Sequence, residues 1–408
     1  MSFLEGMRVP AQSRRTRSNT SVHAAARKQR GLALLVVLLI AMGLLAGMLA
    51  IGFAGDLMRQ NQSQKKTADA LAQAKDVLIG RAVSDDNRPG SLPCPDTDDD
   101  GTAELFSGSS CPSYIGRLPW RTLGLPEPRD AGSERLWYML SSRFRDNAAI
   151  EPLSTDTLGN VTVYSGNSST LLTTQAVAVV FAPGGPLGGQ ARSSTLTAIC
   201  PLGGATVAQS LCVSNYLETA SGINNATASG PYISATPTAS FNDRLLVITT
   251  AELMTPVEKR AATEILALLQ AYRSSIACDC YPWADNWDGA SNYGTTRGRV
   301  PLDDADPNWS DAGVTIPAWL TNNDWWQVFY YAIAPMESED HDPGWLTVDG
   351  VSGNKLVLIT TGPASASRFN NDIWSAYLED SQNSDHDDNT FITPTATAYA
   401  RDRINVIP

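Results

Sequence analysis

The sequence predicts an α+β protein: one long N-terminal helix followed by two domains that each combine a helix with a sheet. Three observations predict this fold class. The 24-residue stretch Leu32 to Gly55 contains no charged side chain and leads into an amphipathic segment. A set of short motifs then occurs twice in the same order. Finally, abundant Ser, Thr, Asn and Gly with 18% charged residues is typical of a β-rich, exported body.

The apolar stretch has the length of a membrane-crossing helix. At 1.5 Å per residue it spans about 36 Å, whereas a hydrocarbon core is about 30 Å thick. Basic residues cluster only on its N-terminal side, so we expect a cytoplasmic N-terminus and export of the chain after Asp56. Apolar residues then recur every three to four positions to about Val83, and Asn87-Arg88-Pro89-Gly90 ends the pattern. One continuous helix from Leu32 to Val83 is the simplest interpretation.

The junction at Gly31 resembles the class III signal of type IV pilins and type II secretion pseudopilins. A basic leader, residues 1–31, ends in this glycine, and Leu-Ala-Leu-Leu-Val-Val-Leu-Leu-Ile follows from Leu32. The resemblance covers Arg27 to about Val83. It implies that a prepilin peptidase cuts after Gly31, that the new amine of Leu32 is methylated, and that residues 32–55 pack in a filament core.

The same resemblance implies the rest of the architecture and the function. Two pilin-like domains, each a helix on an antiparallel sheet, would occupy residues 56–250 and 251–408. Val36 stands fifth after the predicted cut, where major pilins carry a glutamate thought to pair with a neighbour's amine. Its absence resembles the minor subunits that sit at a filament tip. We therefore expect a minor pilin-like subunit of a type IV pilus or type II secretion-type filament.

Localisation and partners follow from this expectation. The protein would be a single-pass protein of the bacterial inner membrane with its body in the periplasm or on a surface filament. Its partners would be other pilins or pseudopilins, the prepilin peptidase and the inner membrane. Residues after the leader carry 23 basic and 41 acidic groups, a net charge of −18, which repels nucleic acid. The alternative function is a membrane-tethered surface binding protein or adhesin that recognises a carbohydrate or a protein.

Two other interpretations of the N-terminus stay open. A conventional secretory signal would be cut near Ala54, although its apolar region normally has only about 7–15 residues. An uncleaved membrane anchor needs no processing at all. The start codon is also ambiguous between Met1 and Met7.

The two domains are predicted to be a degenerate duplication. Each starts with a helix, the second from Thr255 to about Arg273, and continues through a Pro-Asp loop, a Gly-Arg-x-Pro motif, an aromatic helix, a strand, Tyr-Leu-Glu and a final strand. The matching segments of the two copies are 92–96 with 281–285, 116–119 with 298–301, 134–138 with 324–331, 176–182 with 356–360, 216–218 with 377–379, and 241–248 with 400–407. Arg244 and Arg403, in Asp-Arg pairs, either hold the last strand to Tyr-Leu-Glu or form exposed ion pairs.

Six cysteines fit an oxidising compartment and fall in three local couples. These are Cys94 with Cys111, Cys200 with Cys212, and Cys278 with Cys280. Six cysteines allow 15 connectivities, so other pairings stay open. A zinc site is disfavoured because the exported part has only His341 and His386.

One segment has ligand chemistry, Asp96-Thr97-Asp98-Asp99-Asp100-Gly101-Thr102-Ala103-Glu104. Carboxylates at its first, third and fifth positions and glycine at the sixth match the start of an EF-hand calcium loop. The twelfth position is Ser107 instead of glutamate, so Glu104 or a carbonyl would complete the shell. The candidate calcium ligands are therefore Asp96, Asp98, Asp100 and Glu104, and a solvated acidic turn is the alternative. Weaker acidic clusters begin at Asp285 and Asp385.

No catalytic residue is predicted. Nucleophile-elbow, zinc-protease and P-loop motifs are missing from the sequence, although the many acids leave a glycosidase open. We expect a non-enzymatic protein. The ten tryptophans, among them Trp283, Trp287 and the pair Trp325-Trp326, are interpreted as packing residues, with sugar stacking as the alternative.

Overall fold

The computed structural model describes residues 23–147, 151–166, 170–285, 294–302, 309–363, 378, 380–385, 388–394 and 402–408. Side chains at the N-terminal end of this range are described for residues 34–48 and from 58 onward. The chain divides into two compact units, Met1–Ser63 and Gln64–Pro408. The described architecture mixes helices with several small sheets, which confirms the predicted α+β class at that level.

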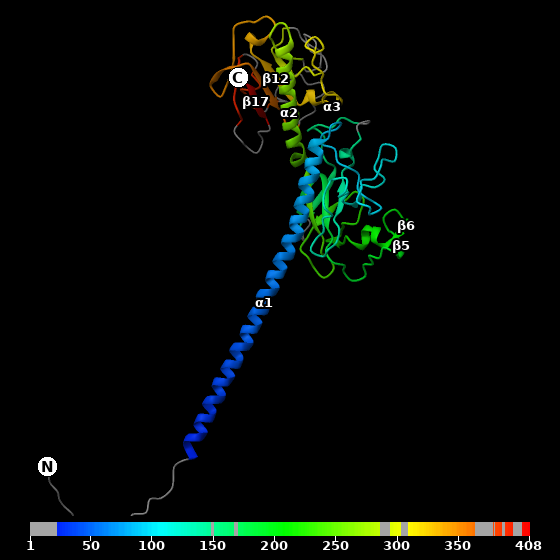
Figure 1. Cartoon of the computed structure of the whole chain (residues 1–408), viewed down its shortest axis with the longest axis vertical. Helices are drawn as coiled ribbons and strands as arrows, with labels where there is room; N and C mark the ends of the chain where they lie inside the picture. Colours follow the sequence, from blue (N-terminus) through cyan, green and yellow to red (C-terminus); the bar gives the residue numbers. More distant parts are fainter. Residues whose placement is uncertain are drawn as a thin grey trace, which may run out of the picture. The chain divides into compact units, whose positions relative to one another are not determined.

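Helix α1, His23–Ser84, begins in the first unit and ends in the second (Figure 1). Its residues 34–48 are all apolar and all exposed, from 48% at Val36 to 73% at Leu34 among the large side chains. This exposed apolar stretch is the most unusual surface among the described residues, because soluble monomers rarely leave such a surface uncovered.

The predicted location as a single-pass inner-membrane protein is wrong. A spanning helix needs about 20 consecutive, mainly apolar residues to match the hydrocarbon thickness. Among the residues that the structure describes, no helix is long and apolar enough to meet this requirement.

The C-terminal end of α1 is fixed by residues directly after it. Oδ1 of Asp85 accepts the backbone N–H groups of Asn87 and Arg88 at 2.9 and 2.7 Å, and its other oxygen pairs with Arg81. Gly90, with φ +98°, donates its N–H to Ala82 O at 2.8 Å. The backbone reverses there because glycine tolerates this left-handed conformation.

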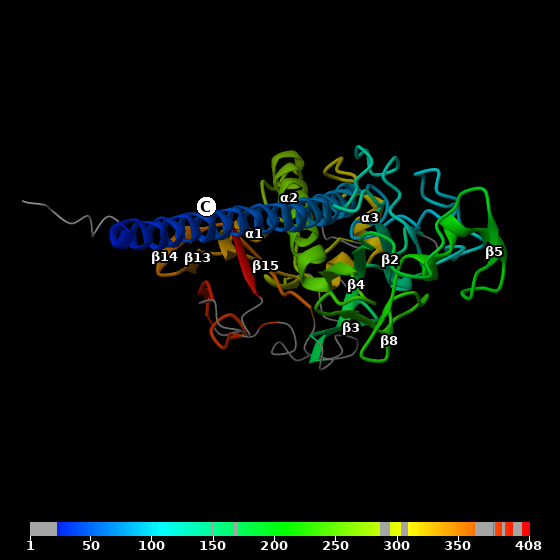
Figure 2. The same cartoon turned by 90° about the horizontal axis from the view of Figure 1, so that it is seen from below.

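The first sheet follows α1 and contains six strands. Its order is β1-β2-β4-β3-β9, and β10 also pairs with β4. Figure 2 labels the strands β2, β4 and β3 of this sheet. All pairs are antiparallel except β3 with β9. The strands are β1 (Ile115–Arg117), β2 (Trp137–Leu140), β3 (Val161–Ser165), β4 (Thr170–Ala182), β9 (Tyr232–Ser234) and β10 (Arg244–Thr249).

Alternate side chains of this sheet enter two different cores. Tyr138 and Leu140 of β2 pack on the helix side, together with Leu71, Ala74 and Leu78 of α1. Trp137 and Met139 belong to the core on the opposite face, which they share with Tyr232 of β9 and where Val213 and Tyr216 cover the sheet. Because side chains alternate along β2, both faces of the sheet are covered. This part of the chain therefore has three layers: helix, sheet and an irregular segment.

That irregular segment, residues 183–231, carries two short hairpins. They are β5 (Thr197–Ile199) with β6 (Thr206–Ala208), and β7 (Thr219–Ala220) with β8 (Ile223–Asn224). The Cys200–Cys212 disulfide ties the loop end of the β5–β6 hairpin, where Cys200 directly follows β5, to a residue four positions after β6.

Helix α2, Thr250–Ser275, starts earlier than the expected Thr255. Thr249 and Glu252 form a capping box, in which a side-chain oxygen of each residue accepts the backbone N–H of the other. Such a box satisfies amide groups that the first helical turn leaves unpaired. The buried face includes Val257, Ala261, Ile265 and Leu269, which recur every four residues along the helix.

The second sheet has the order β11-β12-β15-β17, with every pair antiparallel. The same part of the chain also forms a smaller sheet with the order β14-β13-β16. The elements are β11 (Arg297–Arg299), α3 (Ala318–Asn322), β12 (Phe329–Ile333), β13 (Leu346–Val348), β14 (Val351–Asn354), β15 (Leu356–Thr360), β16 (Thr390–Phe391) and β17 (Arg403–Ile407). Short 3₁₀ turns occur at Ser142–Phe144, Gln209–Leu211, Val213–Asn215, Trp325–Gln327 and Pro335–Glu337.

The prediction that the two aromatic segments are helices is wrong. They form β2 and β12, and only Trp325–Gln327 makes a short 3₁₀ turn. Both strands are buried on both faces, so they read as continuous runs of aromatic and aliphatic residues without a period of two.

One core joins the two halves, which we define as residues 64–249 and 250–408. The core contains Tyr138 and Leu140 of the first sheet, Leu253 and Val257 of α2, and Leu358 of the second sheet. Arg260 of α2 also donates to Val83 O and Asp85 O at 2.6 and 2.7 Å, which satisfies carbonyl groups at the end of α1.

Candidate functional site

The acidic segment 96–104 lies in a loop that the Cys94–Cys111 disulfide closes. Both cysteines are buried, with their Cα atoms 5.5 Å apart. The other two predicted couples, Cys200–Cys212 and Cys278–Cys280, are also bonded. All three local pairings are confirmed. The first disulfide holds the start of the acidic segment against the first sheet. There the backbone of Asp96 forms an antiparallel β-bridge with Arg117 of β1.

Asp96 organises the loop around its own carboxylate. Its side chain is almost fully buried; Oδ1 accepts the N–H of Asp99 at 2.7 Å and Oδ2 accepts the N–H of Gly101 at 2.8 Å. Burial raises the pKa of Asp96 to about 6, although these two hydrogen bonds oppose the shift. The loop thus concentrates a poorly solvated carboxylate at its centre.

Gly101 is required at the turn for two reasons. Its φ of +88° disfavours any residue with a side chain, and a Cβ atom would lie 2.6 Å from the ring of Trp120. The sixth-position glycine of the sequence motif is therefore used as a turn residue, as the spacing predicts.

Three of the four predicted calcium ligands lie together. Asp96, Asp98 and Glu104 each offer a carboxylate oxygen, and these oxygens lie within 4.8 Å of one another. Glu104 Oε1 accepts from the N–H and hydroxyl of Thr97, at 3.0 and 2.5 Å. Three converging carboxylates are the oxygen ligands that a hard cation such as Ca²⁺ prefers.

Asp100, the fourth predicted ligand, is not in this group. It is fully exposed, and its Oδ1 accepts from the N–H and hydroxyl of Thr102 at 2.6 and 2.5 Å. These hydrogen bonds lower the pKa of Asp100. Asp100 therefore lies apart from the three converging carboxylates, because Gly101 reverses the chain immediately after it.

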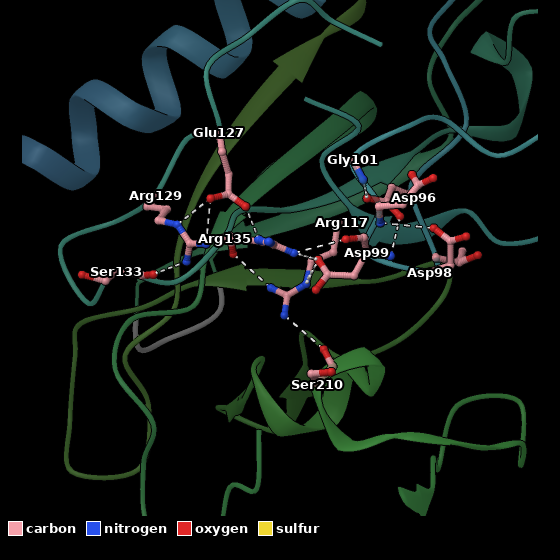
Figure 3. Close-up of polar contacts among 12 residues, drawn as sticks. Asp96, Asp98, Asp99, Gly101, Arg117, Glu127, Arg129, Ser133, Arg135 and Ser210 are labelled. Carbon is pink, nitrogen blue, oxygen red and sulfur yellow. Dashed lines mark hydrogen bonds and ion pairs between the residues drawn. The ribbon is translucent and has the colours of Figure 1, made fainter. Parts of the chain in front are cut away.

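Asp99 belongs to an arginine network beside the loop (Figure 3). Its Oδ1 lies 2.6 Å from Arg135 Nη1, and Arg135 also pairs with Glu127, which in turn binds Arg129 at 2.7 Å. Asp99 is therefore neutralised by protein cations, and it is not available to a metal in the way that Asp98 and Glu104 are.

Arg117 is the residue of this region that the sequence interpretation missed. The guanidinium lies 4.2 Å from the ring centre of Trp137 and 4.1 Å from that of Tyr216. Nη1 donates to Arg135 O and Nη2 to Ser210 O, both at 3.1 Å. Burial lowers the pKa of Arg117. The repeated Gly-Arg-x-Pro motif contained the signal, because an arginine that recurs inside a strand must be held by partners.

A second buried acidic group holds the last strand of the first sheet. Asp243 Oδ2 accepts from Glu218 N at 2.9 Å and from Asn225 Nδ2 at 3.0 Å, and Glu218 Oε2 accepts from Asn242 N at 2.9 Å. Burial, and secondarily the charge of Glu218, raise the pKa of Asp243 to about 9. The predicted link to Tyr-Leu-Glu exists, but Asp243 makes it, and Arg244 is exposed.

The other predicted positions play different parts. Trp283 and Trp325 are buried core residues, as expected, whereas Trp287, His386 and most of the second acidic cluster lie outside the described residues. His341 is exposed, with its two ring nitrogens each 3.0 Å from a backbone carbonyl oxygen. The side chains at the predicted processing site, Gly31 and Leu32, are also outside the described part of α1.

No family model, curated protein or solved structure matches this chain.

Proposed function

We propose that the protein is a minor pilin-like structural subunit of a filament of the type IV pilus or type II secretion type. One observation carries the proposal: residues 34–48 of α1 present only apolar side chains, and all of them are exposed. Burial of apolar surface contributes about 25 cal/mol per Å². Packing these side chains against the same segment of neighbouring subunits would therefore provide a large driving force for assembly.

The sequence around this segment supports the same proposal. A basic leader ends at Gly31, and the apolar residues start at Leu32, in the manner of prepilin-type signals. Val36 has no carboxylate to pair with a neighbour's amine, so this subunit would be rare and unable to polymerise alone. A tip position satisfies both conditions.

The two halves support a duplicated pilin-like body. The strand path β1-β2-β4-β10 corresponds to β11-β12-β15-β17, and each first strand carries Gly-Arg-x-Pro. Tyr138 donates to Pro93 O at 3.3 Å, and Tyr331 donates to Pro282 O at 3.0 Å. The backbone of Asp96 forms an antiparallel β-bridge with Arg117 in the first half, and the backbone of Asp285 forms one with Arg299 in the second. A duplication explains why four independent details recur.

We also propose calcium as the ligand of the loop at Asp96, Asp98 and Glu104. The support is the convergence of the three carboxylates and the burial of Asp96, since a divalent cation would compensate both their repulsion and the lost hydration. Calcium would then stabilise the loop and its contacts with the first sheet.

Assembly is tested with substitutions on α1. Leu38→Lys should abolish incorporation into filaments, because a charge would be buried among apolar helices. Gln62→Lys, at an exposed polar position of the same helix, is the matched control and should be incorporated normally. Equal incorporation of both variants would contradict the proposed packing surface.

Processing gives an independent test. Mass spectrometry of the protein from cells that contain the peptidase should find Leu32 as the first residue, carrying a methyl group, and Gly31→Leu should block the cut. An N-terminus at Met1 or Met7 would exclude the pilin assignment, and one near Gly55 would indicate a conventional secretory signal.

A further inference from the structure

A cavity of about 550 Å³ lies on the side of the first sheet that faces away from α1. Ile115 and Trp137 of the sheet form one wall, and Leu202, Ala205 and Val207 of the β5–β6 region form the other. The volume is within the range of ligand pockets, and the lining is mainly apolar. It is separate from the carboxylate cluster, of which only Asp96 reaches its lining.

Disulfides fix both walls. Cys111, bonded to Cys94, and Cys200, bonded to Cys212, each contribute to the lining. Arg117, held between Trp137 and Tyr216, lies at the sheet wall. The cavity is therefore preformed, which lowers the entropic cost of binding.

The loops that border the cavity expose large apolar side chains. Leu105 is 87% exposed in the loop that ends at Cys111, and Ile199 is 72% exposed immediately before Cys200. Leu196, at the start of the same hairpin, is 61% exposed. Figure 1 shows this hairpin, β5 with β6, at the periphery of the first half. A small molecule would fill the cavity and leave these side chains in water. A peptide segment would fill the cavity and also cover the exposed side chains.

The charge beside the cavity selects the kind of peptide. Asp98 and Asp100 are exposed in the loop whose Asp96 and Thr97 line the cavity. The chain after the leader has a net charge of −18, so the field around the opening favours cations.

We propose that this cavity is a docking site for a partner protein segment that inserts a leucine- or phenylalanine-class side chain and carries lysine or arginine on either side. The anchor fills the space between Trp137 and Val207, and the flanking cations face Asp100, the exposed acid of this loop that lies outside the carboxylate cluster. The site does not depend on filament assembly, so it stands or falls separately from the proposed structural role.

The probe is a fluorescent peptide of alternating leucine, phenylalanine and lysine, titrated into the full chain with its disulfides intact. Two further peptides replace either the lysines by glutamate or the apolar residues by serine. We expect saturable binding of the first peptide that weakens with salt, and binding weaker by about tenfold or more for each of the others. Equal binding of the serine peptide would overturn the proposal, because charge alone would then suffice, and so would the absence of saturable binding by the first peptide.

Variants locate the site. Ala205→Trp fills the cavity from an exposed lining position and should weaken binding by about tenfold or more. Thr206→Trp, at the exposed first residue of β6 and outside the cavity lining, is the matched control and should bind as the wild type does. Binding unchanged by Ala205→Trp would overturn the location. If Ala205→Trp displaces only an apolar dye, 1-anilinonaphthalene-8-sulfonate, while no peptide binds, the cavity takes small molecules and the peptide proposal is wrong.

Discussion

The two halves of the body share a strand path but differ in what they insert into it. In both halves a Gly-Arg-x-Pro strand lies beside a strand whose tyrosine donates to a proline carbonyl. Among the described residues, the first half adds the acidic loop, the arginine network and the disulfide-bonded hairpin, whereas the second adds the small sheet β14-β13-β16. The repeated residues therefore serve the fold, and the chemistry lies in the segments that differ.

The largest expected effect tests the repeated frame itself. A Cβ atom at Gly116 would lie 2.4 Å from Asp96 O, and one at Gly298 would lie 1.9 Å from Asp285 O. Gly116→Ala and Gly298→Ala should each lower the free energy of unfolding by about 3 kcal/mol or more, because backbone must move. Chemical denaturation measures this, with Gly185→Ala as the control, since nothing lies within 4 Å of its Cβ position. A strong loss at only one of the two sites would break the proposed equivalence.

Calcium should separate the halves. If it binds only the folded loop, it stabilises by RT ln(1 + [L]/Kd), about 2.7 kcal/mol at a hundredfold excess over Kd. Because the two halves share one core, they should melt together, and hydrogen exchange at residues 96–104 is the better measurement. Millimolar calcium should slow this exchange, and Asp98→Asn should remove the effect while preserving the turn made by Asp96. Identical exchange with calcium and with chelator would leave a solvated acidic turn.

The pH dependence of stability should come mainly from the first half. Because the pKa of Asp243 is raised to about 9, its contribution is fully present below about pH 4, the usual pKa of Asp, and is lost as the pH rises toward 9. One proton contributes a slope of at most about 1.4 kcal/mol per pH unit. Asp243→Asn, which resembles the protonated acid, should flatten the profile measured by denaturation, and the exposed Asp311→Asn should leave it unchanged. A wild-type profile that rises toward pH 9 would contradict the assignment.

The smallest effect compares the two tyrosines. Tyr138→Phe and Tyr331→Phe each remove one buried hydrogen bond to a carbonyl oxygen and should cost about 1 kcal/mol each. Thermal denaturation should show similar shifts for the two variants and a smaller shift for Tyr164→Phe, at a half-exposed position. Clearly unequal losses would show that the two contacts are not equivalent.

The parts of the fold visible in the sequence were those set by local pattern. The apolar run 176–182 lies within β4, the run 356–360 is β15, and the three cysteine couples formed as neighbours in the chain would. The aromatic segments misled because a strand buried on both faces has no period of two, so Trp325-Trp326 and Phe329-Tyr330-Tyr331 looked helical.

The parts of the site that could not be predicted depend on contacts across the chain. Asp96 and Asp98 could be proposed from spacing, but the loss of Asp99 to Arg135 depends on a residue 36 positions away. The cavity could not be found at all, since its walls come from β1–β2 and from the hairpin at 197–208. Asp243 was recognised only through its neighbour Arg244, because burial is not visible in an Asp-Arg pair.

The core shared by both halves has a consequence for synthesis of the chain. When only residues 1–249 have left the ribosome, β10 and the end of α1 are available to the first sheet. Helix α2 is still missing, so Leu253, Met254 and Val257 do not yet cover their part of the helix side of the sheet. The nascent chain would therefore hold an incomplete apolar face while the segment 34–48 is also uncovered. We therefore expect chaperones to bind the nascent chain until α2 has been synthesised. For the same reason, dividing the chain between its two similar halves should not give two pieces that fold separately.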